Sequence, residues 1–300
     1  MGLSFRQQLL LPSLLLVIFP ILAWWWLSQY GTELEQIQRK AMKSNLELLS
    51  TYLTSKAELS NEILEIKDFN KTRDLYASNA VNEISLDGKD KDWLDVQPIH
   101  SQSIHYGLSE LINIDYPYTE ESLQIDLRVA YQNDDLYLYI SVLDESVIYR
   151  DLNNLSVHRN DHISFILVNE KNTHQRYTFA PYQPSLSTAF AVTSSGRALR
   201  PISKLKAYWS ATDKGYDFEV KIPRSMIGEK FRWWVADVDD AETRLIKYNM
   251  GNAKQDETSS LQFPSQALTL ELQNYELGKV TIRDVHNRLI AESGSIDQRF

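Results

Sequence analysis

The sequence predicts an all-β antiparallel sandwich that follows an N-terminal transmembrane helix and a helical stalk. Three observations lead to this prediction. An uncharged apolar run extends from Leu9 to Leu27, a stretch without glycine or proline extends from Thr32 to Phe69, and short apolar runs separated by polar turns fill the chain after Lys71. Many short strands without intervening helices are typical of sandwiches and barrels.

The apolar run is long enough to cross a membrane, because roughly 20 apolar residues span the hydrocarbon core. Three tryptophans, 24–26, close the run, and tryptophan prefers the membrane interface. A cleaved signal peptide is the alternative, but Trp-Trp-Trp-Leu makes a poor cleavage site. We expect residues 1–8 to be cytoplasmic, 9–29 to span the inner (cytoplasmic) membrane, and the rest to be periplasmic. Basic residues within 39–43 count against this orientation, but long domains translocate largely regardless of charge.

Residues 30–71 predict the helical stalk, because they are dense in good helix formers. The apolar residues recur at spacings of three and four and so form one stripe. The stripe fits a helix that packs on its own domain, and it also fits a stalk that forms a homodimer with a second copy. Asn45 and Ser55 interrupt the heptad seam, so both alternatives stay open. The stripe consists of Leu34, Ile37, Ala41, Leu48, Tyr52, Leu59, Ile63 and Ile66.

We expect residues 72–266 to form the β-sandwich and residues 267–300 to form a C-terminal, membrane-proximal and incomplete β segment. Asn133-Asp134-Asp135 and Asp213-Lys214-Gly215 each separate two strand candidates and are hairpin signals. The strongest candidates are 127–131, 136–143, 163–168, 177–179, 218–222 and 233–238, and the weaker ones are 84–86, 189–193, 205–209 and 268–272.

Composition excludes several classes of function. The chain has 300 residues and a formal net charge of −9, which argues against nucleic acid as a partner because phosphate binding needs a basic face. It has no cysteine, which excludes disulfides, thiolate metal sites and a cysteine nucleophile. Adjacent carboxylates occur at 134–135 and 239–240, but adjacent side chains diverge instead of converging in a hydrolytic site.

Four aromatic residues are candidates for ligand binding: Trp209, Tyr182, Trp233 and Trp234. Aromatic rings bind sugars by stacking on the apolar face of the sugar ring. Trp233 and Trp234 point to opposite faces of a strand, so at least one is expected in the core. Tyr182 lies between two prolines in a loop, where recognition residues concentrate.

Four carboxylates are candidate metal ligands: Asp87, Asp144, Asp237 and Asp239. Hard oxygen ligands suit a structural calcium ion, although the spacing matches no dedicated calcium loop. Asp87 also fits the role of a turn former, because it stands in a Leu-Asp-Gly sequence.

Residues 83–240 carry a series of motifs that resembles the family 9 carbohydrate-binding modules. The resemblance implies a jelly-roll-like β-sandwich and a carbohydrate ligand. Asn160 stands where the family pattern has glycine. The motifs are Ile84-Ser85-Leu86-Asp87-Gly88 with Asp92-Trp93, Leu136-Tyr137-Leu138-Tyr139-Ile140, Asn160-Asp161-His162-Ile163-Ser164-Phe165, Gly215-Tyr216-Asp217-Phe218-Glu219-Val220-Lys221-Ile222-Pro223, and Val235-Ala236-Asp237-Val238-Asp239.

The layout of span, stalk, sandwich and the segment 280–294 is similar to the sensory half of a bacterial sensor histidine kinase, of the type associated with the proteobacterial dedicated sortase system. This resemblance implies a ligand-sensing region of a two-component system, with a second span and a kinase core after Phe300. Residues 1–300 contain no catalytic motif, so the sequence leaves enzyme activity undecided. The alternatives are a membrane-tethered carbohydrate-binding module and a spacer or protein-interaction module without a signalling role.

Overall fold

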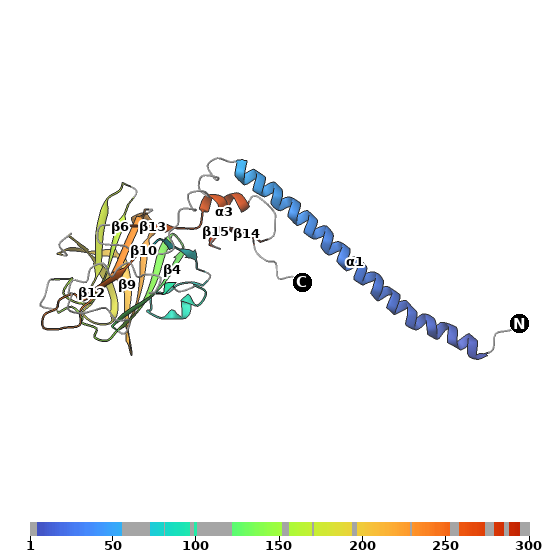
Figure 1. Cartoon of the computed structure of the whole chain (residues 1–300), viewed down its shortest axis with the longest axis horizontal. Coiled ribbons are helices and arrows are strands. Elements are labelled where there is room, and N and C mark those ends of the chain that lie inside the picture. Colours follow the sequence, from blue (N-terminus) through green and yellow to red (C-terminus); the bar gives the residue numbers. More distant parts are fainter. Residues whose placement is uncertain are drawn as a thin grey trace. The chain divides into compact units, whose positions relative to one another are not determined.

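The structure is a computed structural model, and the chain divides into two compact units, Met1–Glu62 and Ile63–Phe300 (Figure 1). The described residues are 5–55, 73–80, 82–96, 99–100, 122–151, 156–169, 171–193, 197–228, 230–252, 258–273, 279–284 and 288–294.

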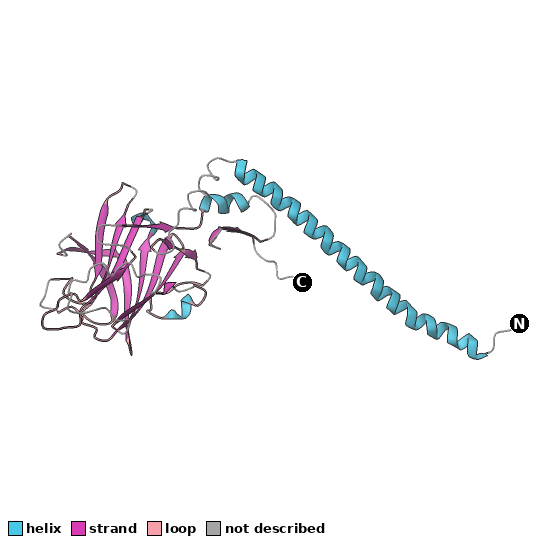
Figure 2. Ribbon diagram, viewed as in Figure 1, coloured by secondary structure: helices cyan, strands magenta, loops and turns pink. Residues whose placement is uncertain are grey.

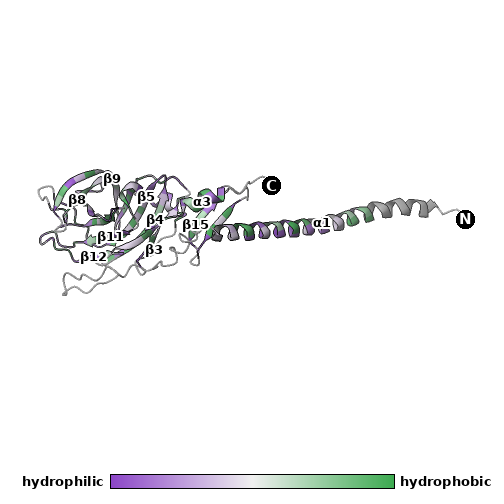
Figure 3. Ribbon diagram, turned by 90° about the horizontal axis from the view of Figure 1, so that it is seen from above, coloured by the Kyte–Doolittle hydropathy of each residue, from purple (hydrophilic) through white to green (hydrophobic). Residues whose placement is uncertain are grey.

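The first unit contains one long helix, α1 (Phe5–Ser55). In Figure 3 the ribbon of α1 is coloured mostly as hydrophobic next to its grey N-terminal part, and hydrophilic colours are mixed in farther along the helix. Within the part of the chain that is described, no helix has both the length and the apolar character of a membrane span. The side chains of 5–17 and the stalk residues 56–71 lie outside the described residues. The predicted span and the pairing of stalks therefore stay predictions.

The second unit is mostly β (Figure 2). Short 3-10 helices also occur, at η2 (Asp90–Trp93) and η5 (Arg224–Met226). The strands of its large sheet are β1 (Leu75–Tyr76), β2 (Ser78–Asn79), β3 (Ile99–His100), β4 (Leu123–Gln132), β5 (Asp135–Asp144), β6 (His162–Val168), β7 (His174–Phe179), β8 (Ser185–Val192), β9 (Ala198–Thr212), β10 (Gly215–Pro223), β11 (Lys230–Asp237), β12 (Tyr248–Gly251) and β13 (Ser259–Gln262).

These thirteen strands, counted over the described residues, form one sheet. Its order is β1-β13-β11-β6-β7-β8-β9-β10-β5-β4-β2, with β12 also paired to β11 and β3 to β4. The long pairs are antiparallel, as predicted. The central position predicted for the apolar strand at 136–143 is confirmed, because β5 lies between β10 and β4.

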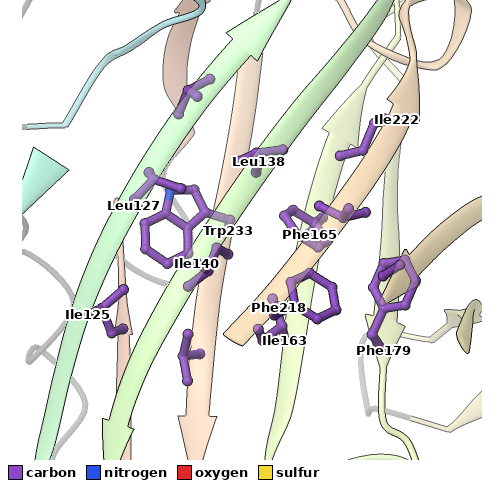
Figure 4. Close-up of a cluster of buried hydrophobic side chains, with 14 of the residues drawn as sticks. Ile125, Leu127, Leu138, Ile140, Ile163, Phe165, Phe179, Phe218, Ile222 and Trp233 are labelled. Atoms are coloured by element: carbon purple, nitrogen blue, oxygen red, sulfur yellow. The ribbon is translucent and has the colours of Figure 1, made fainter. Parts of the chain in front are cut away.

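The sheet folds over a single large core, as expected of a sandwich. One half contributes β4, β5, β9 and β10, and the other contributes β6, β7 and β11. Figure 4 shows Trp233 of β11 beside Leu127 of β4 and Ile140 of β5. The rings of Phe165 in β6 and Phe218 in β10 lie 6.4 Å apart between centroids. The all-β prediction is confirmed in part, because the unit is mostly β and sandwich-like.

Both predicted hairpin turns are present. Gln132 pairs with Asp135 across a two-residue turn, in which Asn133 and Asp134 have φ of 51° and 64°. Positive φ at both central positions is typical of the turn that matches the twist of a hairpin, and asparagine and aspartate tolerate it. The second hairpin turns at 213–214, where β9 ends and β10 begins.

Two of the weaker strand predictions are wrong. Residues 84 and 85 have no regular secondary structure and 86 begins a bend, whereas 268–272 lie in a helix, α3 (Gln266–Gln273). The Ser265 side chain accepts a hydrogen bond of 3.0 Å from the backbone N–H of Leu268, which caps the first turn of α3. Leu268 and Leu272, four residues apart, are buried, whereas Leu270 is exposed. The helical period therefore overrides the apparent alternation. Beyond α3, β14 (Val280–Arg283) and β15 (Leu289–Ser293) form a separate hairpin.

A short segment joins the two edges of the large sheet. β1 pairs in parallel with β13 at one edge, and β2, two residues later, pairs in parallel with β4 at the other. The backbone N–H of Ala77 donates to Gln262 at 2.9 Å, and that of Ala80 donates to Tyr131 at 3.0 Å. We call residues 75–80 the seam.

Candidate functional site

A cavity of about 780 Å³ lies beside the loop that connects β7 to β8. The loop contributes Tyr182, and β8 contributes Leu186, Ser187 and Phe190. Tyr182 exposes 42% of its surface and Leu186 exposes 56%, so both offer apolar area to a ligand. The cavity therefore combines an exposed aromatic ring with the side chains of a sheet surface.

Arg150 is the central charged group of the cavity wall. Its guanidinium lies 4.1 Å from the centroid of the Tyr182 ring and 4.8 Å from that of Phe190. It also donates a hydrogen bond to the Tyr182 hydroxyl, and its backbone N–H donates to Pro181 at 3.0 Å. Burial lowers the pKa of Arg150. These contacts fix Tyr182 in place, so the loop is built around Arg150.

Two buried polar atoms in the cavity wall have no hydrogen-bond partner among the described residues: Nε of Arg150 and Oγ of Ser187. A buried polar atom without a partner costs about 1–3 kcal/mol. Arg150 forms no ion pair with a carboxylate of the described residues. Such atoms are suited to bind polar groups of a ligand.

A break in strand pairing lies among the residues that line the cavity. Thr188 lies opposite Lys206 of β9, but the next residue, Ala189, lies opposite Ile202. The extra residues in β9 form an irregular bulge, and bulges re-aim side chains. Phe190 lines the cavity beyond the break and packs against the small buried cluster of Val157, Ala180 and Val192.

Of the four predicted aromatic residues, the structure places Tyr182 alone in the cavity. Trp209 is fully buried and stacks on Tyr216 at 4.0 Å between ring centroids, and Trp233 is fully buried in the core. The ligand-binding role predicted for Trp209 is therefore wrong, because its ring points into the core, and the burial of Trp233 agrees with the expectation that at least one of the two adjacent tryptophans is in the core. Trp234 faces the other side of β11 but is also buried, between the guanidinium groups of Arg176 at 4.7 Å and Arg232 at 4.5 Å.

A second candidate site is a cluster of acidic residues at one end of the sheet. Carboxylate oxygens of Asp144, Asp161 and Asp237 lie within 4.8 Å of one another, and so do those of Asp144, Glu145 and Asp239. Asp144 ends β5, Asp237 ends β11, and Asp161 immediately precedes β6. Three strand ends from both halves of the sheet therefore converge. We call these five residues the acidic cluster.

The acidic cluster combines fixed and unsatisfied oxygens. Asp161 accepts hydrogen bonds from the backbone N–H groups of Val238, at 2.7 Å, and Ile148. Both carboxylate oxygens of Asp237 are buried without a hydrogen-bond partner among the described residues, as are one oxygen of Asp144 and one of Asp239. Asp237 exposes only 1% of its surface. Unsatisfied buried oxygens aimed at one point are what a hard cation requires.

Burial makes the charged form of these carboxyls unfavourable. It raises the pKa of Asp161 to about 9, with the charge of Asp144 adding to the effect. It also raises the pKa of Asp237 to about 9 and that of Asp144 to about 6. Lys247 pairs with Glu145 at 3.2 Å and with Asp239, at the margin of the cluster. The buried carboxyls therefore need a proton or a cation.

Three of the four predicted metal ligands, Asp144, Asp237 and Asp239, lie in the acidic cluster, whereas Asp87 does not. The prediction misses two members of the cluster, Asp161 and Glu145. Asp161 stands directly before an apolar strand and Glu145 directly follows Asp144, positions that the sequence does display. Asp87 instead forms ion pairs with Lys89 at 3.8 Å and Lys91 at 3.3 Å. The metal role predicted for Asp87 is therefore wrong, whereas its predicted role as a turn former is supported by a hydrogen bond of 3.1 Å that its Oδ1 accepts from the backbone N–H of Lys89.

Comparison with known proteins finds similarity at the level of solved structures alone. No family model matches the chain, and no curated protein matches it. A family 9 carbohydrate-binding module from Caldicellulosiruptor kristjanssonii in complex with cellotriose has 12% identity and a TM-score of 0.45, covering 71% of this chain and 100% of that chain. A family 9 module from the same organism in complex with glucose has 12% identity and a TM-score of 0.43, covering 65% and 97%.

A Bacteroides uniformis protein assigned as carbohydrate-binding has 13% identity and a TM-score of 0.43, covering 64% of this chain and 99% of that one. Since all three TM-scores lie below 0.5, we base the functional proposal on the residues of this chain.

Proposed function

We propose that the β-rich unit binds a carbohydrate in the cavity at Tyr182. The observation that carries the proposal is the pairing of an exposed aromatic ring with two buried polar atoms that lack partners, Arg150 Nε and Ser187 Oγ. A sugar has an apolar face for the ring and hydroxyl groups for the polar atoms. A purely apolar ligand would leave both atoms unsatisfied, at a cost in affinity.

Calorimetric titration of the full chain with a panel of neutral and acidic oligosaccharides, cellotriose among them, tests this proposal. We expect the oligosaccharide that binds the wild type to bind the Tyr182→Ala variant at least about tenfold more weakly, a loss of ~1.4 kcal/mol. Tyr182→Phe keeps the ring and should lose less. Calorimetry is preferred to tryptophan fluorescence because Trp209, Trp233 and Trp234 are buried.

Leu245→Ala is the matched control, since Leu245 is 62% exposed and does not line the cavity. The proposal fails if no oligosaccharide binds, or if Tyr182→Ala and Leu245→Ala bind with the same affinity.

We further propose that this binding unit belongs to a membrane-anchored sensory region, with the bulk of the chain periplasmic. The unbroken helix α1 supports this role, because a rigid helix can transmit a change in packing or rotation. The apolar residues between Ile18 and Trp26 of α1 are mostly exposed, which supports insertion in a bilayer. Cross-linking of α1 between copies, with and without bound oligosaccharide, tests the role; helices that stay monomeric in both states contradict it.

A second function, binding of a structural calcium ion, is favoured by the acidic cluster. Asp144, Asp161 and Asp237 would hold the ion, with Asp239 and Glu145 at the margin. Calcium prefers carboxylate oxygens in sites of flexible geometry. The supporting observation is that Asp237 is buried with both carboxylate oxygens unpartnered among the described residues. Equilibrium dialysis with calcium tests the proposal, and the absence of retained calcium would exclude it.

A further inference from the structure

We infer that the cavity at Tyr182 selects a sugar that carries a carboxylate group, a uronic acid, over its neutral counterpart. This inference rests on the proposed carbohydrate site and names its substrate class. The evidence is the charge of the cavity wall and the burial of its arginine.

The charged side chains that line the cavity, among the described residues, are Arg150, Lys206 and Asp151. Together they carry a net charge of +1, in a chain whose formal net charge is −9. A cavity of this sign in an acidic protein favours an anionic ligand. A single positive charge matches one carboxylate better than a doubly charged phosphate group.

Arg150 is the group that would pair with the carboxylate. It is 9% exposed, and no carboxylate of the described residues forms an ion pair with it. Its Nε atom is buried without a partner, although the guanidinium lines the cavity. Arginine binds carboxylates through charge-assisted hydrogen bonds that are about twice as strong as neutral ones. Burying the charge of Arg150 without a counter-ion costs free energy, and a carboxylate on the ligand would offset this cost.

The aromatic contacts of Arg150 make it a selective group. Its guanidinium lies 4.1 Å from the centroid of the Tyr182 ring and 4.8 Å from that of Phe190, and packing on two rings restricts the rotamers of the side chain. Less conformational freedom is therefore lost when the carboxylate binds. The same Tyr182 ring offers its exposed surface to the sugar, so a uronic acid can contact the ring and the guanidinium together.

The test uses pairs of oligosaccharides that differ by one charge per sugar: oligogalacturonate, oligoglucuronate and oligomannuronate, each as the free acid and as its methyl ester. We expect at least one acid to bind the full chain about tenfold more tightly than its ester. Arg150→Gln should bring the acid and the ester to within about threefold, mainly by weakening the acid.

Two surface variants keep the test informative if Arg150→Gln fails to fold. Lys206 is exposed, so Lys206→Gln should lower the affinity for the acid without affecting folding. Asp151→Asn removes the negative charge at the cavity and should raise the affinity for the acid form of the oligosaccharide. Raising the salt concentration should narrow the difference in affinity between the acid and the ester, because salt screens the charge interaction.

Equal binding of acid and ester overturns this inference and leaves the carbohydrate site standing. If neither form binds in any pair and the neutral oligosaccharides bind at the Tyr182 site, the inference is overturned alone. Failure of every member of both panels overturns the carbohydrate site itself.

Discussion

The carboxylate of Glu219 accepts a hydrogen bond of 2.8 Å from the indole N–H of Trp93, which lies 126 residues earlier in the chain. The other oxygen of Glu219 accepts two more, from the backbone N–H groups of Asp87 and Gly88, both at 3.0 Å. Two motifs that are far apart in the sequence, the Asp-Gly turn with its tryptophan and the strand β10, are therefore one structural unit. Glu219 is fully buried and holds this unit together.

Replacing Glu219 with glutamine should destabilise the β-rich unit although the side chain keeps its shape. Both carboxylate oxygens accept N–H groups, so the amide NH2 of glutamine must face a donor. We expect the free energy of unfolding to fall by about 1–3 kcal/mol. Urea denaturation monitored by circular dichroism measures the change. An unchanged midpoint would show that the three hydrogen bonds contribute nothing to stability.

Gly88→Ala should also lower the free energy of unfolding, by about 1–3 kcal/mol. Gly88 has a φ of +69°, and an added Cβ would lie 2.7 Å from Cδ1 of Tyr208 and 2.8 Å from Cβ of Ser210. The matched control is Gly31→Ala in α1, where an added Cβ meets nothing within 4 Å. We expect the control to leave the denaturation midpoint of the β-rich unit unchanged. Equal effects of the two variants would contradict the strain at Gly88.

Without calcium, the β-rich unit should lose stability as the pH rises from 6.5 to 9. Burial raises the pKa of Asp161 and Asp237 to about 9 from an ordinary value of 3.8, so in this window the native state binds protons that the unfolded state has lost. The loss approaches ~1.4 kcal/mol per pH unit for each carboxyl.

His162 opposes this loss only at the low end of the window, because burial lowers its pKa to about 3 from an ordinary value of 6.5, so that above about pH 7.5 it is neutral in both the native and the unfolded state. Denaturation in the presence of a chelator at several pH values gives the slope. A stability that rises or stays flat between pH 6.5 and 9 contradicts the prediction.

Asp237→Asn should separate the cation role of the acidic cluster from its proton role. The variant has no charge at this position. With a chelator present at pH 8, we therefore expect its free energy of unfolding to exceed that of the wild type by ~1 kcal/mol or more. Calcium at a hundred times its dissociation constant should stabilise the wild type by ~2.7 kcal/mol and the variant much less. Asp213→Asn, in an exposed turn, is the control. Equal calcium stabilisation of Asp237→Asn and wild type would exclude Asp237 as a ligand.

The long antiparallel strands and their turns could be predicted from the sequence because local signals determine them. Asn133 and Asp134 specify a tight turn by their backbone preferences alone, and the apolar run that follows can only be a central strand. The helix α3 could not be distinguished from a strand, since Leu268, Leu270 and Leu272 alternate; the cap by Ser265 was the overlooked signal.

The candidate sites were predictable in part. Which face of β9 carries Trp209 depends on contacts with distant strands, so its burial is not visible in the sequence. Arg150 follows no motif and becomes part of a site through its contact with Tyr182, 32 residues later. Asp161 is paired in space with Asp237 by the register of β6 and β11, which a single sequence does not show.

The seam has a mechanical consequence. Residues 75–80 pair with both edge strands of the sheet and follow α1 in the chain. A force applied to the N-terminal side therefore acts on the seam before it acts on any long strand. The few backbone hydrogen bonds of residues 75–80 are the first contacts that such tension would stretch, and the pairing among the long strands does not depend on them. Under such a force, the seam should therefore detach in a small first step, before the rest of the β-rich unit unfolds.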